Sequence, residues 1–353
     1  MNFLIVRLGA LGDIIHAVPA AAALRAAFPD SRIDWLVDSK HVPMVDLVTV
    51  VDRAVVLERP SVAGWIDVSR RLRSTQYDAA IDFQGLLKSA VLARASGARR
   101  VVGFSIWHLR EKTARPFYSE TGGGQDSSAD GMADHVVLKN DHVVLKNLAL
   151  LRALGVTDTV IRFPLAQVES KALEEVRTAL GGDRPFALIN PGAAWPNKRW
   201  PPERFGEVAA FLRDIRGLPS FVLWGPGEES LAGAVVDRSE GAARLAPVTS
   251  LSDVLALSRA ASLMVSGDTG PLHIAAAAGT PAVSLFGPTD PHRNGPWAPD
   301  DVAISRYGAC GCHYERRCRK TAWCLESIEV AEVTAAIQQR LLRSAGPAPG
   351  RAG

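Results

Sequence analysis

The sequence has 353 residues, of which 47% are hydrophobic and 22% charged, and its 40 basic and 37 acidic side chains give a net charge of +3. This composition is that of a folded globular protein; it excludes a disordered or fibrous chain, and the even charge balance excludes a dedicated nucleic-acid binder. The length predicts two domains at about 150 residues each, and the lack of an apolar run near the ~20 residues of a membrane-spanning helix, or of a signal-peptide core, predicts a cytoplasmic location.

The first half of the chain alternates short β-branched runs with amphipathic helical patterns. Strands are expected at 3–8, 33–37, 54–57, 79–83 and 100–104, and helices at 14–28, 62–75 and 86–95. Such an alternation is typical of a parallel sheet covered on both faces.

The second half repeats this order. Strands are expected at 186–190, 220–224, 244–246, 262–266 and 282–286, and helices at 202–215, 228–240, 251–260 and 271–278. Phe163-Pro164-Leu165 separates the halves, which predicts domains at 1–164 and 165–345 and a disordered tail at 346–353. We therefore expect an α/β protein with two Rossmann-like domains facing each other across a cleft, and ligands at the carboxyl ends of the strands.

Two segments depart from the alternation. Residues 119–131 are polar and glycine-rich, which is typical of a mobile loop. The heptad Asp134–Asn140 is then repeated letter for letter as Asp141–Asn147. Since seven residues are nearly two helical turns, we expect both copies to lie in one helix over Met132–Leu154.

Gly9-Ala10-Leu11-Gly12-Asp13 follows the first strand and opens the first helix. The glycines permit a tight turn and a close approach to a ligand, and a helix N-terminus favours anionic groups. An alternative is that Asp13 is only a helix cap. The G-x-G-x-x-G spacing is missing, which argues against a nicotinamide dehydrogenase.

Asp268-Thr269-Gly270-Pro271-Leu272-His273 has the same position in the second half. The Thr269 hydroxyl and the Gly270 amide can donate to a pyrophosphate at the start of the helix. An alternative is an ordinary helix cap, with His273 as a hydrogen-bonded core histidine.

Two further loops at strand ends carry charged side chains. Lys198 and Arg199 follow the strand at 186–190, where a lysine can neutralise phosphate charge. Glu228 follows Trp224-Gly225-Pro226-Gly227, where a carboxylate can hold ribose hydroxyls. The alternatives are a solvated lysine and an acidic residue that stabilises the first turn of a helix.

All the cysteines fall in one short segment. Cys310, Cys312, Cys318 and Cys324 have the spacing C-x-C-x5-C-x5-C, which excludes a disulfide framework across the whole chain. Four thiols this close together can bind a structural zinc ion, and His313 can replace one of them. A local disulfide and free reduced thiols are the alternatives.

Five motifs together resemble a known family: Arg7–Ile14, Asp82–Ala90, Lys198–Pro201, Asp268–His273 and Phe286–Pro291. The chain resembles the bacterial lipopolysaccharide heptosyltransferases, the ADP-heptose-dependent GT-B glycosyltransferases of family 9, and is most similar to heptosyltransferase I. The motifs occur in the family's order along nearly the whole chain. Asn190-Pro191-Gly192 is more similar to heptosyltransferase II.

The resemblance implies an inverting, metal-independent transfer of heptose from ADP-heptose to the Kdo region of lipid A, with no cofactor. It makes Asp13 the general base. The donor-binding residues that it implies are Lys198, Glu228, Asp268, Thr269, Gly270 and His273, and the acceptor-binding residues are Gly12, Gln84, Lys88 and Ser89. A leaving diphosphate needs cationic and amide donors already in place, and the chain has no D-x-D metal motif.

The resemblance also implies partners and a location. The donor is ADP-heptose and the acceptor is of the Kdo2-lipid A type, so we expect a peripheral protein on the cytoplasmic face of the inner membrane, without nucleic acid. The basic clusters 70–73, 99–100 and 110–115, with Trp65 and Trp107 near them, can attract anionic headgroups, although a solvated helix face is the simpler reading of each. Heptosyltransferase II, another family-9 transferase, a GT-B-like nucleotide-sugar epimerase and a silent nucleotide-sugar binding module are the alternatives.

Overall fold

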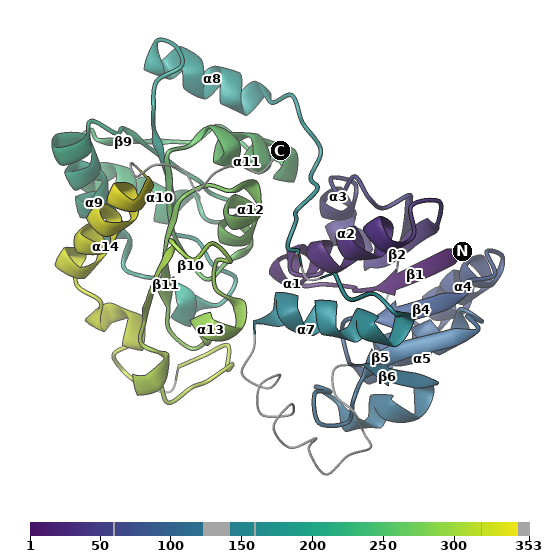
Figure 1. The fold of residues 1–353 in the computed structure, drawn as a ribbon. Coiled ribbons are helices and arrows are strands. Elements are labelled where there is room, and N and C mark those ends of the chain that lie inside the picture. The colour runs from purple at the N-terminus through teal and green to yellow at the C-terminus, as the bar shows by residue number, and fades with distance from the viewer. Residues whose placement is uncertain (59–60, 123–141, 159, 319, 345–353) are drawn as a thin grey trace. The chain divides into compact units, whose positions relative to one another are not determined.

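Two six-stranded parallel sheets carry the fold of the computed structural model (Figure 1). The structure describes residues 1–58, 61–122, 142–158, 160–318 and 320–344. Contacts divide the chain into two units, one of residues 1–166 and one that begins at Gln167. Each unit is described by itself.

The N-terminal sheet has the strand order β3-β2-β1-β4-β5-β6 and every pair is parallel. Its strands are β1 Asn2–Val6, β2 Arg32–Asp38, β3 Arg53–Leu57, β4 Ala79–Asp82, β5 Arg100–Phe104 and β6 Glu120–Gly122. At the carboxyl end of β1, Val6 pairs with Leu36 and Asp82, so the loops after three neighbouring strands meet at one edge. The short β6 has no hydrophobic run and was not expected from the sequence.

The helices of this unit lie on both faces of the sheet, with α4 and α5 on one face and α2 and α7 on the other (Figure 1). They are α1 Leu11–Ile15, α2 Val18–Ala27, α3 Val42–Val45, α4 Val62–Arg73, α5 Leu87–Ala95 and α7 Val143–Leu150, with shorter turns at Ser39–His41, Lys112–Phe117 and Leu151–Leu154. The single helix expected over 14–28 is wrong. Pro19 has no N–H for the Ile15 carbonyl, so α1 ends at Ile15, and α2 begins at Val18 with this proline in its first turn.

The second copy of the repeated heptad forms most of α7. The imidazole of His142 accepts a hydrogen bond from Val144 N (3.2 Å) at the start of this helix, and Asn147 donates to the His16 carbonyl (3.0 Å). Val144 and Leu148 are buried. Of the helix expected over 132–154 the structure describes residues 142–154, which form α7 and then the short 3-10 turn Leu151–Leu154. The first copy with the remaining residues of this helix, residues 123–131 of the expected loop and the expected tail lie outside the described residues.

The C-terminal sheet has the order β12-β11-β10-β7-β8-β9, again with parallel pairs only. Its strands are β7 Ala187–Asn190, β8 Ser220–Val222, β9 Ala243–Leu245, β10 Leu263–Gly267, β11 Ala282–Phe286 and β12 Val302–Ser305. β10 lies between β7 and β11, so the loops after these strands meet at one edge of the sheet. β12 was not expected, because its hydrophobic run Val302–Ile304 is only three residues long and, as the structure shows, is not buried.

Helices α9, α10 and α14 pack together on one side of this sheet, and α11 and α12 on the other (Figure 1). The helices are α8 Lys171–Leu180, α9 Pro202–Arg216, α10 Glu229–Arg238, α11 Leu251–Ala260, α12 Gly270–Ala278, α13 Pro291–Asn294 and α14 Val330–Ser344, with short turns η4 Pro196–Lys198, η5 Tyr307–Ala309 and η6 Cys324–Ser327. The core joins strand residues such as Ile189 and Val265 to Phe205 and Ile337 of the helices. The loop that carries Lys198 therefore leaves from a rigid, buried strand.

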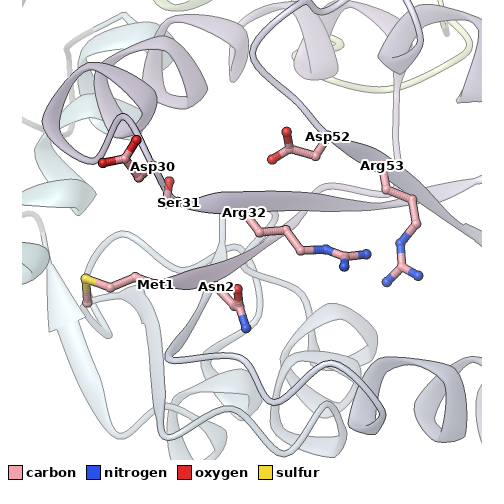
Figure 2. Close-up of a pocket in the computed structure, with 7 residues that line it drawn as sticks. All are labelled: Met1, Asn2, Asp30, Ser31, Arg32, Asp52 and Arg53. Carbon is pink, nitrogen blue, oxygen red and sulfur yellow. The ribbon is translucent and has the colours of Figure 1, made fainter.

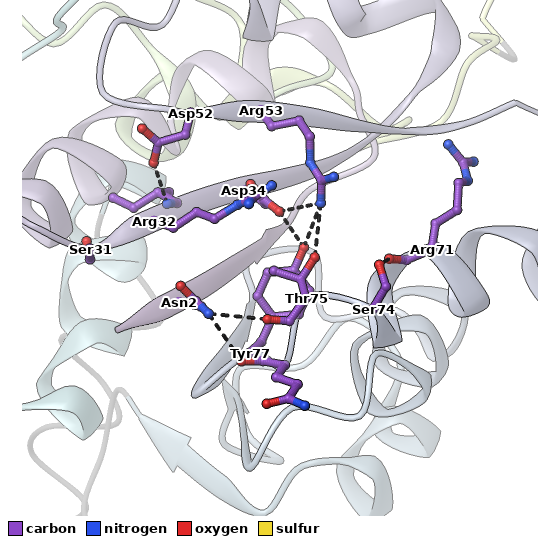
Figure 3. Close-up of polar contacts among 12 residues, drawn as sticks. Asn2, Ser31, Arg32, Asp34, Asp52, Arg53, Arg71, Ser74, Thr75 and Tyr77 are labelled. Atoms are coloured by element: carbon purple, nitrogen blue, oxygen red, sulfur yellow. Dashed lines mark hydrogen bonds and ion pairs between the residues drawn. The ribbon is translucent and has the colours of Figure 1, made fainter.

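A polar pocket lies at the amino end of the N-terminal sheet (Figure 2). It is lined by Met1, Asn2, Asp30, Ser31, Arg32, Asp52 and Arg53. Beside it, the fully buried carboxylate of Asp34 is 2.6 Å from Arg53 Nη2, 3.0 Å from Arg32 Nε and 2.6 Å from the Tyr77 hydroxyl (Figure 3). These side chains meet one another's hydrogen-bonding needs at the amino end of the sheet, opposite the expected ligand site. We therefore assign them a structural role.

The substitution Tyr77→Phe tests this structural role. Burial raises the pKa of Tyr77 to about 12, so its hydroxyl stays a proton donor to Asp34. Losing a hydrogen bond to a buried carboxylate should lower the free energy of unfolding by about 1.5–3 kcal/mol. Urea denaturation measures the change, with Tyr314→Phe, which alters a 42% exposed side chain, as the control. Equal unfolding midpoints for Tyr77→Phe and the wild type would contradict the assignment.

Candidate functional site

The N-terminal unit holds Asp13 at the carboxyl end of β1. Arg7, whose side chain is 6% exposed, forms an ion pair with the Asp13 carboxylate, and its Nη1 donates to the Phe83 carbonyl (2.5 Å). Asp13 itself is 25% exposed. The guanidinium thus links the loops after β1 and β4 and orients a carboxylate that a ligand can reach.

Asp82 lies behind this loop and is fully buried. It accepts hydrogen bonds from the Tyr118 hydroxyl (2.7 Å), the Ser89 hydroxyl (2.8 Å) and Gln84 N (2.8 Å). Burial raises the pKa of the Asp82 carboxyl, and these hydrogen bonds offset part of the rise. Gln84 Oε1 in turn accepts from Leu8 N (2.8 Å), so the network connects β4 to the loop that precedes Asp13.

The four residues expected to bind the acceptor have different surroundings. Gln84 and Ser89 are buried and their side chains hold the loops of their own unit. Lys88 is exposed in the first turn of α5, and Gly12 lies in α1 next to Asp13. Only Lys88 and Gly12 are therefore placed for direct contact with a ligand.

His41 belongs to the same edge and was missed by the sequence analysis. A Cβ added to Gly9 would lie 2.8 Å from the His41 ring, so the imidazole packs directly on this glycine. Burial, helped by the charge of Lys40, lowers the pKa of His41. The available signal was its position shortly after β2, whose carboxyl end meets the same edge.

In the C-terminal unit, Asp268 collects four side chains around one buried carboxylate. Lys198 Nζ lies 2.5 Å from Oδ2 and His273 Nε2 lies 3.2 Å from Oδ1. The Thr289 hydroxyl donates to Oδ2 (2.6 Å), and Asn294 Nδ2 donates to Oδ1 (3.3 Å). Burial alone would raise the pKa of Asp268, but the hydrogen bond from His273 and the charge of Lys198 outweigh it and hold the pKa well below its ordinary value.

Thr289 and Asn294 had no expected role. They come from the segment after β11, which lies beside β10 in the sheet, so strand adjacency was the signal that could have found them. A close backbone approach completes the cluster. A Cβ on Gly267, the residue before Asp268, would lie 2.8 Å from the Lys198 carbonyl, so only glycine admits η4 here.

The N-terminus of α12 lies next to Asp268. Thr269 is its N-cap and Gly270 its first residue, and the Thr269 hydroxyl accepts a hydrogen bond from Asn190 Nδ2 (2.9 Å). Free amides at a helix start attract anions. The structure thus brings together Lys198, Asp268, Thr269, Gly270 and His273, five of the six residues expected to bind the donor.

Glu228 lies at the end of a neighbouring strand. It is the N-cap of α10, and its Oε2 accepts from Gly225 N (3.1 Å). A Cβ on Gly192 would lie only 2.3 Å from the same oxygen, so the loop after β7 packs against this carboxylate without a side chain. In the same loop Lys198 Nζ is 4.5 Å from the centre of the Trp195 ring, a cation–π contact that also limits its motion.

The four cysteines are free thiols. Cys310 Sγ lies 3.3 Å from Cys312 Sγ, none of the cysteines is in a disulfide, and burial raises the pKa of both thiols. Within the described part of the chain, no three histidine, cysteine or acidic side chains already have a metal-binding arrangement.

Among the residues that the structure describes, no helix is long and apolar enough to cross a membrane.

Comparisons with known proteins identify the family and the fold. Residues 65–324 match the family model of glycosyltransferase family 9 (heptosyltransferase). The chain is 28% identical to lipopolysaccharide heptosyltransferase 1 of Pseudomonas aeruginosa, over 90% of this chain and 87% of the relative, and 30% identical to that of Escherichia coli K12, over 82% and 89%. The solved structure of E. coli heptosyltransferase WaaC with ADP has a TM-score of 0.73 at 24% identity and covers 98% of this chain and 99% of that one. This match confirms the predicted pair of Rossmann-like domains.

The substitution Asp268→Asn tests the charge balance of the buried cluster. It keeps the shape but leaves Lys198 without its counter-charge, which should lower the free energy of unfolding by about 2–3 kcal/mol near neutral pH. Because the folded-state pKa of Asp268 lies below its ordinary 3.8, the wild-type advantage should be complete above about pH 5 and shrink as the pH falls below about 4.

Calorimetry of both proteins across this pH range measures the effect. Asp30→Asn, an exposed acid at the other end of the N-terminal unit, is the control and should leave the free energy of unfolding unchanged. A wild-type advantage that did not vary with pH would show that Asp268 contributes by shape rather than charge.

Proposed function

Because the chain belongs to glycosyltransferase family 9, the heptosyltransferase family, and is therefore a glycosyltransferase, we propose that it transfers heptose from ADP-heptose to the Kdo region of lipid A, the reaction of heptosyltransferase I. The observation that carries this proposal is the cluster at the end of β10, where Lys198 is held by Asp268, the residue before the N-cap of α12. The relatives named heptosyltransferase 1, which match over most of both chains, support the same choice.

The donor is held by its diphosphate and its ribose. Lys198 and the amides at Thr269 and Gly270 face the phosphates, and Glu228 accepts hydrogen bonds from the ribose hydroxyls. His273 and Asp268 hold the lysine in place before the donor arrives. Donors fixed in advance stabilise the charge that develops on the leaving diphosphate. We propose that they do so without a divalent ion, so transfer should proceed without added metal.

Asp13 acts as the general base. It accepts the proton of the acceptor hydroxyl as that oxygen forms a bond to the anomeric carbon of the heptose. The bond from this carbon to the phosphate oxygen breaks on the opposite side, so the configuration inverts and ADP leaves. Arg7 keeps the carboxylate oriented for this transfer.

The acceptor is bound by the N-terminal unit at a membrane surface. Lys88 is exposed for contact with an acidic acceptor, while Gln84 and Ser89 shape the loops from inside. Trp107, 65% exposed, lies near Arg110 and Lys112 in the sequence. Aromatic and basic side chains of this kind bind anionic headgroups, which supports a peripheral position on the cytoplasmic face of the inner membrane.

Product analysis tests the proposed reaction. The protein is incubated with ADP-heptose and either Kdo2-lipid A or an acceptor that already carries one heptose. Mass spectrometry should show one added heptose on the first acceptor and none on the second. Transfer only to the second acceptor would indicate heptosyltransferase II, and an isomerised donor sugar without any acceptor would indicate an epimerase.

The contrast between Asp13 and Lys198 tests the assigned roles. Asp13→Asn keeps size and capping ability but loses the proton acceptor, so turnover should fall by roughly 10²–10⁴-fold with ADP affinity nearly unchanged. Lys198→Ala should weaken ADP binding and also slow transfer, because the lysine meets the diphosphate in both states. Steady-state kinetics and calorimetric ADP titration measure these effects, with Asp30→Asn as the control.

Near-normal turnover of Asp13→Asn would leave this residue as a helix cap only, since asparagine caps as well as aspartate. Unchanged ADP affinity in Lys198→Ala would remove the lysine from the donor site.

A further inference from the structure

The cysteine segment lies directly against the loop that carries Lys198. Asn197 Nδ2 donates to the Glu315 carbonyl (3.0 Å), and Trp200 Nε1 donates to the Ile328 carbonyl (3.0 Å). Arg204 Nη1 reaches the carbonyls of Glu326 (2.6 Å) and Ile328 (2.5 Å). The cysteine segment thus fixes Asn197, the residue before Lys198, and the residues that directly follow Cys324 fix Trp200 and Arg204 after it.

The four thiols meet although they come from different parts of this segment. Besides the 3.3 Å contact between Cys310 and Cys312, Asn197 lies 3.9 Å from Cys312 Sγ through its Nδ2, and Cys324 Sγ packs against Gly287 beside the Asn197 carbonyl. Cys324 lies close enough to Cys310, and Cys318 to Cys312, for their thiols to influence one another's pKa. Cys310 and Cys312 are almost fully buried. Every cysteine of the chain is therefore in one connected cluster.

The surroundings of the cluster contain groups that can stabilise thiolates once a metal ion replaces the thiol protons. Cys312 N donates to Cys310 Sγ (3.5 Å), and Asn197 Nδ2 lies 3.9 Å from Cys312 Sγ. Hydrogen bonds from N–H groups to sulfur stabilise metal-bound thiolates. A Cβ on Gly311 would lie 3.9 Å from Lys320 Nζ, which places a positive charge beside the cluster. Four thiolates around a divalent ion carry a net charge of about −2, which such a cation balances.

We propose that Cys310, Cys312, Cys318 and Cys324 bind one thiophilic divalent metal ion, zinc or iron, and that this ion holds the Lys198 loop in position. Four sulfur ligands in a tetrahedral arrangement select these metals. Binding releases the thiol protons to solvent and draws the four sulfurs from their present pairwise contacts around one point. The ion is structural: the reacting sugar and the diphosphate meet other residues.

The consequence for Lys198 follows from packing. A Cβ on Gly287 would lie 3.0 Å from Cys324 Sγ and 3.4 Å from the Asn197 carbonyl, so this glycine, the thiol and the residue before Lys198 are in direct contact. Loss of the ion frees the segment below the loop and with it the lysine. This second part rests on the proposed role of Lys198 in ADP binding, whereas metal binding itself does not.

Metal analysis of the purified full-length protein is the first test. Inductively coupled plasma mass spectrometry should find about one zinc or iron ion per chain after dialysis, and Cys312→Ser and Cys324→Ser should lose nearly all of it. His313→Gln is the matched control, since this exposed imidazole lies in the same segment and bonds to the Tyr307 carbonyl instead. It should keep the metal.

Metal-free wild-type protein, whether with free thiols or with a disulfide, would overturn the proposal, and so would loss of metal in His313→Gln. Where a serine variant does not fold, cobalt substitution of the wild type keeps the test valid. Bound cobalt should give the near-ultraviolet absorption of cobalt–thiolate bonds, and its absence would count against the site.

Calorimetric titration with ADP tests the positioning role separately. The folded serine variants should bind ADP about tenfold more weakly than His313→Gln. Unchanged ADP affinity in a folded, metal-free variant would refute the positioning role while leaving the metal site. Metal bound as expected in a protein that fails to transfer heptose would refute the proposed reaction alone.

Discussion

Asp268 has almost no contact with water, and its carboxylate stays charged only because Lys198 and His273 approach it. A buried charge needs partners with good geometry, since the cost of removing it from water is several kcal/mol. The partners come from the loops after β7, β10 and β11, which are neighbours in the sheet. The sheet order is thus what makes the ion pair possible, and the ion pair is what fixes a lysine beside a helix N-terminus.

The N-terminal unit solves a related problem with the charges reversed. There the buried partner is the cation: Arg7 is almost inaccessible, and the partly exposed carboxylate of Asp13 is the group presented to a ligand. In the other unit the buried partner is the anion, Asp268, and the presented group is Lys198. One unit therefore presents a fixed negative group suited to accept a proton, and the other a fixed positive group suited to hold a diphosphate.

Most strands and the loops that carry the charged site residues could be predicted from the sequence. Strands of parallel sheets are continuous hydrophobic runs, and the loops at their ends are rich in glycine and charged residues. The Asp268 loop and Asp13 were found in this way. Three kinds of feature were not predicted. β6 lacks a hydrophobic run, and that of β12 is only three residues long. The break between α1 and α2 lies within a continuous apolar pattern, with Pro19 in the first turn of α2. His41, Thr289 and Asn294 join their clusters only through strand adjacency. Adjacency is a property of the sheet order, and a linear pattern does not contain it.

The duplicated heptad determines how the fold would respond to a deletion of seven residues. Helix α7 packs through Val144 and Leu148, which are buried, and through Asn147, which donates to the His16 carbonyl. The two copies of the heptad are identical in sequence. Removing either copy produces one and the same polypeptide, so a genetic contraction by one unit would preserve every contact that this surface makes with the second copy. The contacts described for α7 are therefore those that a chain with a single copy of the heptad would also make.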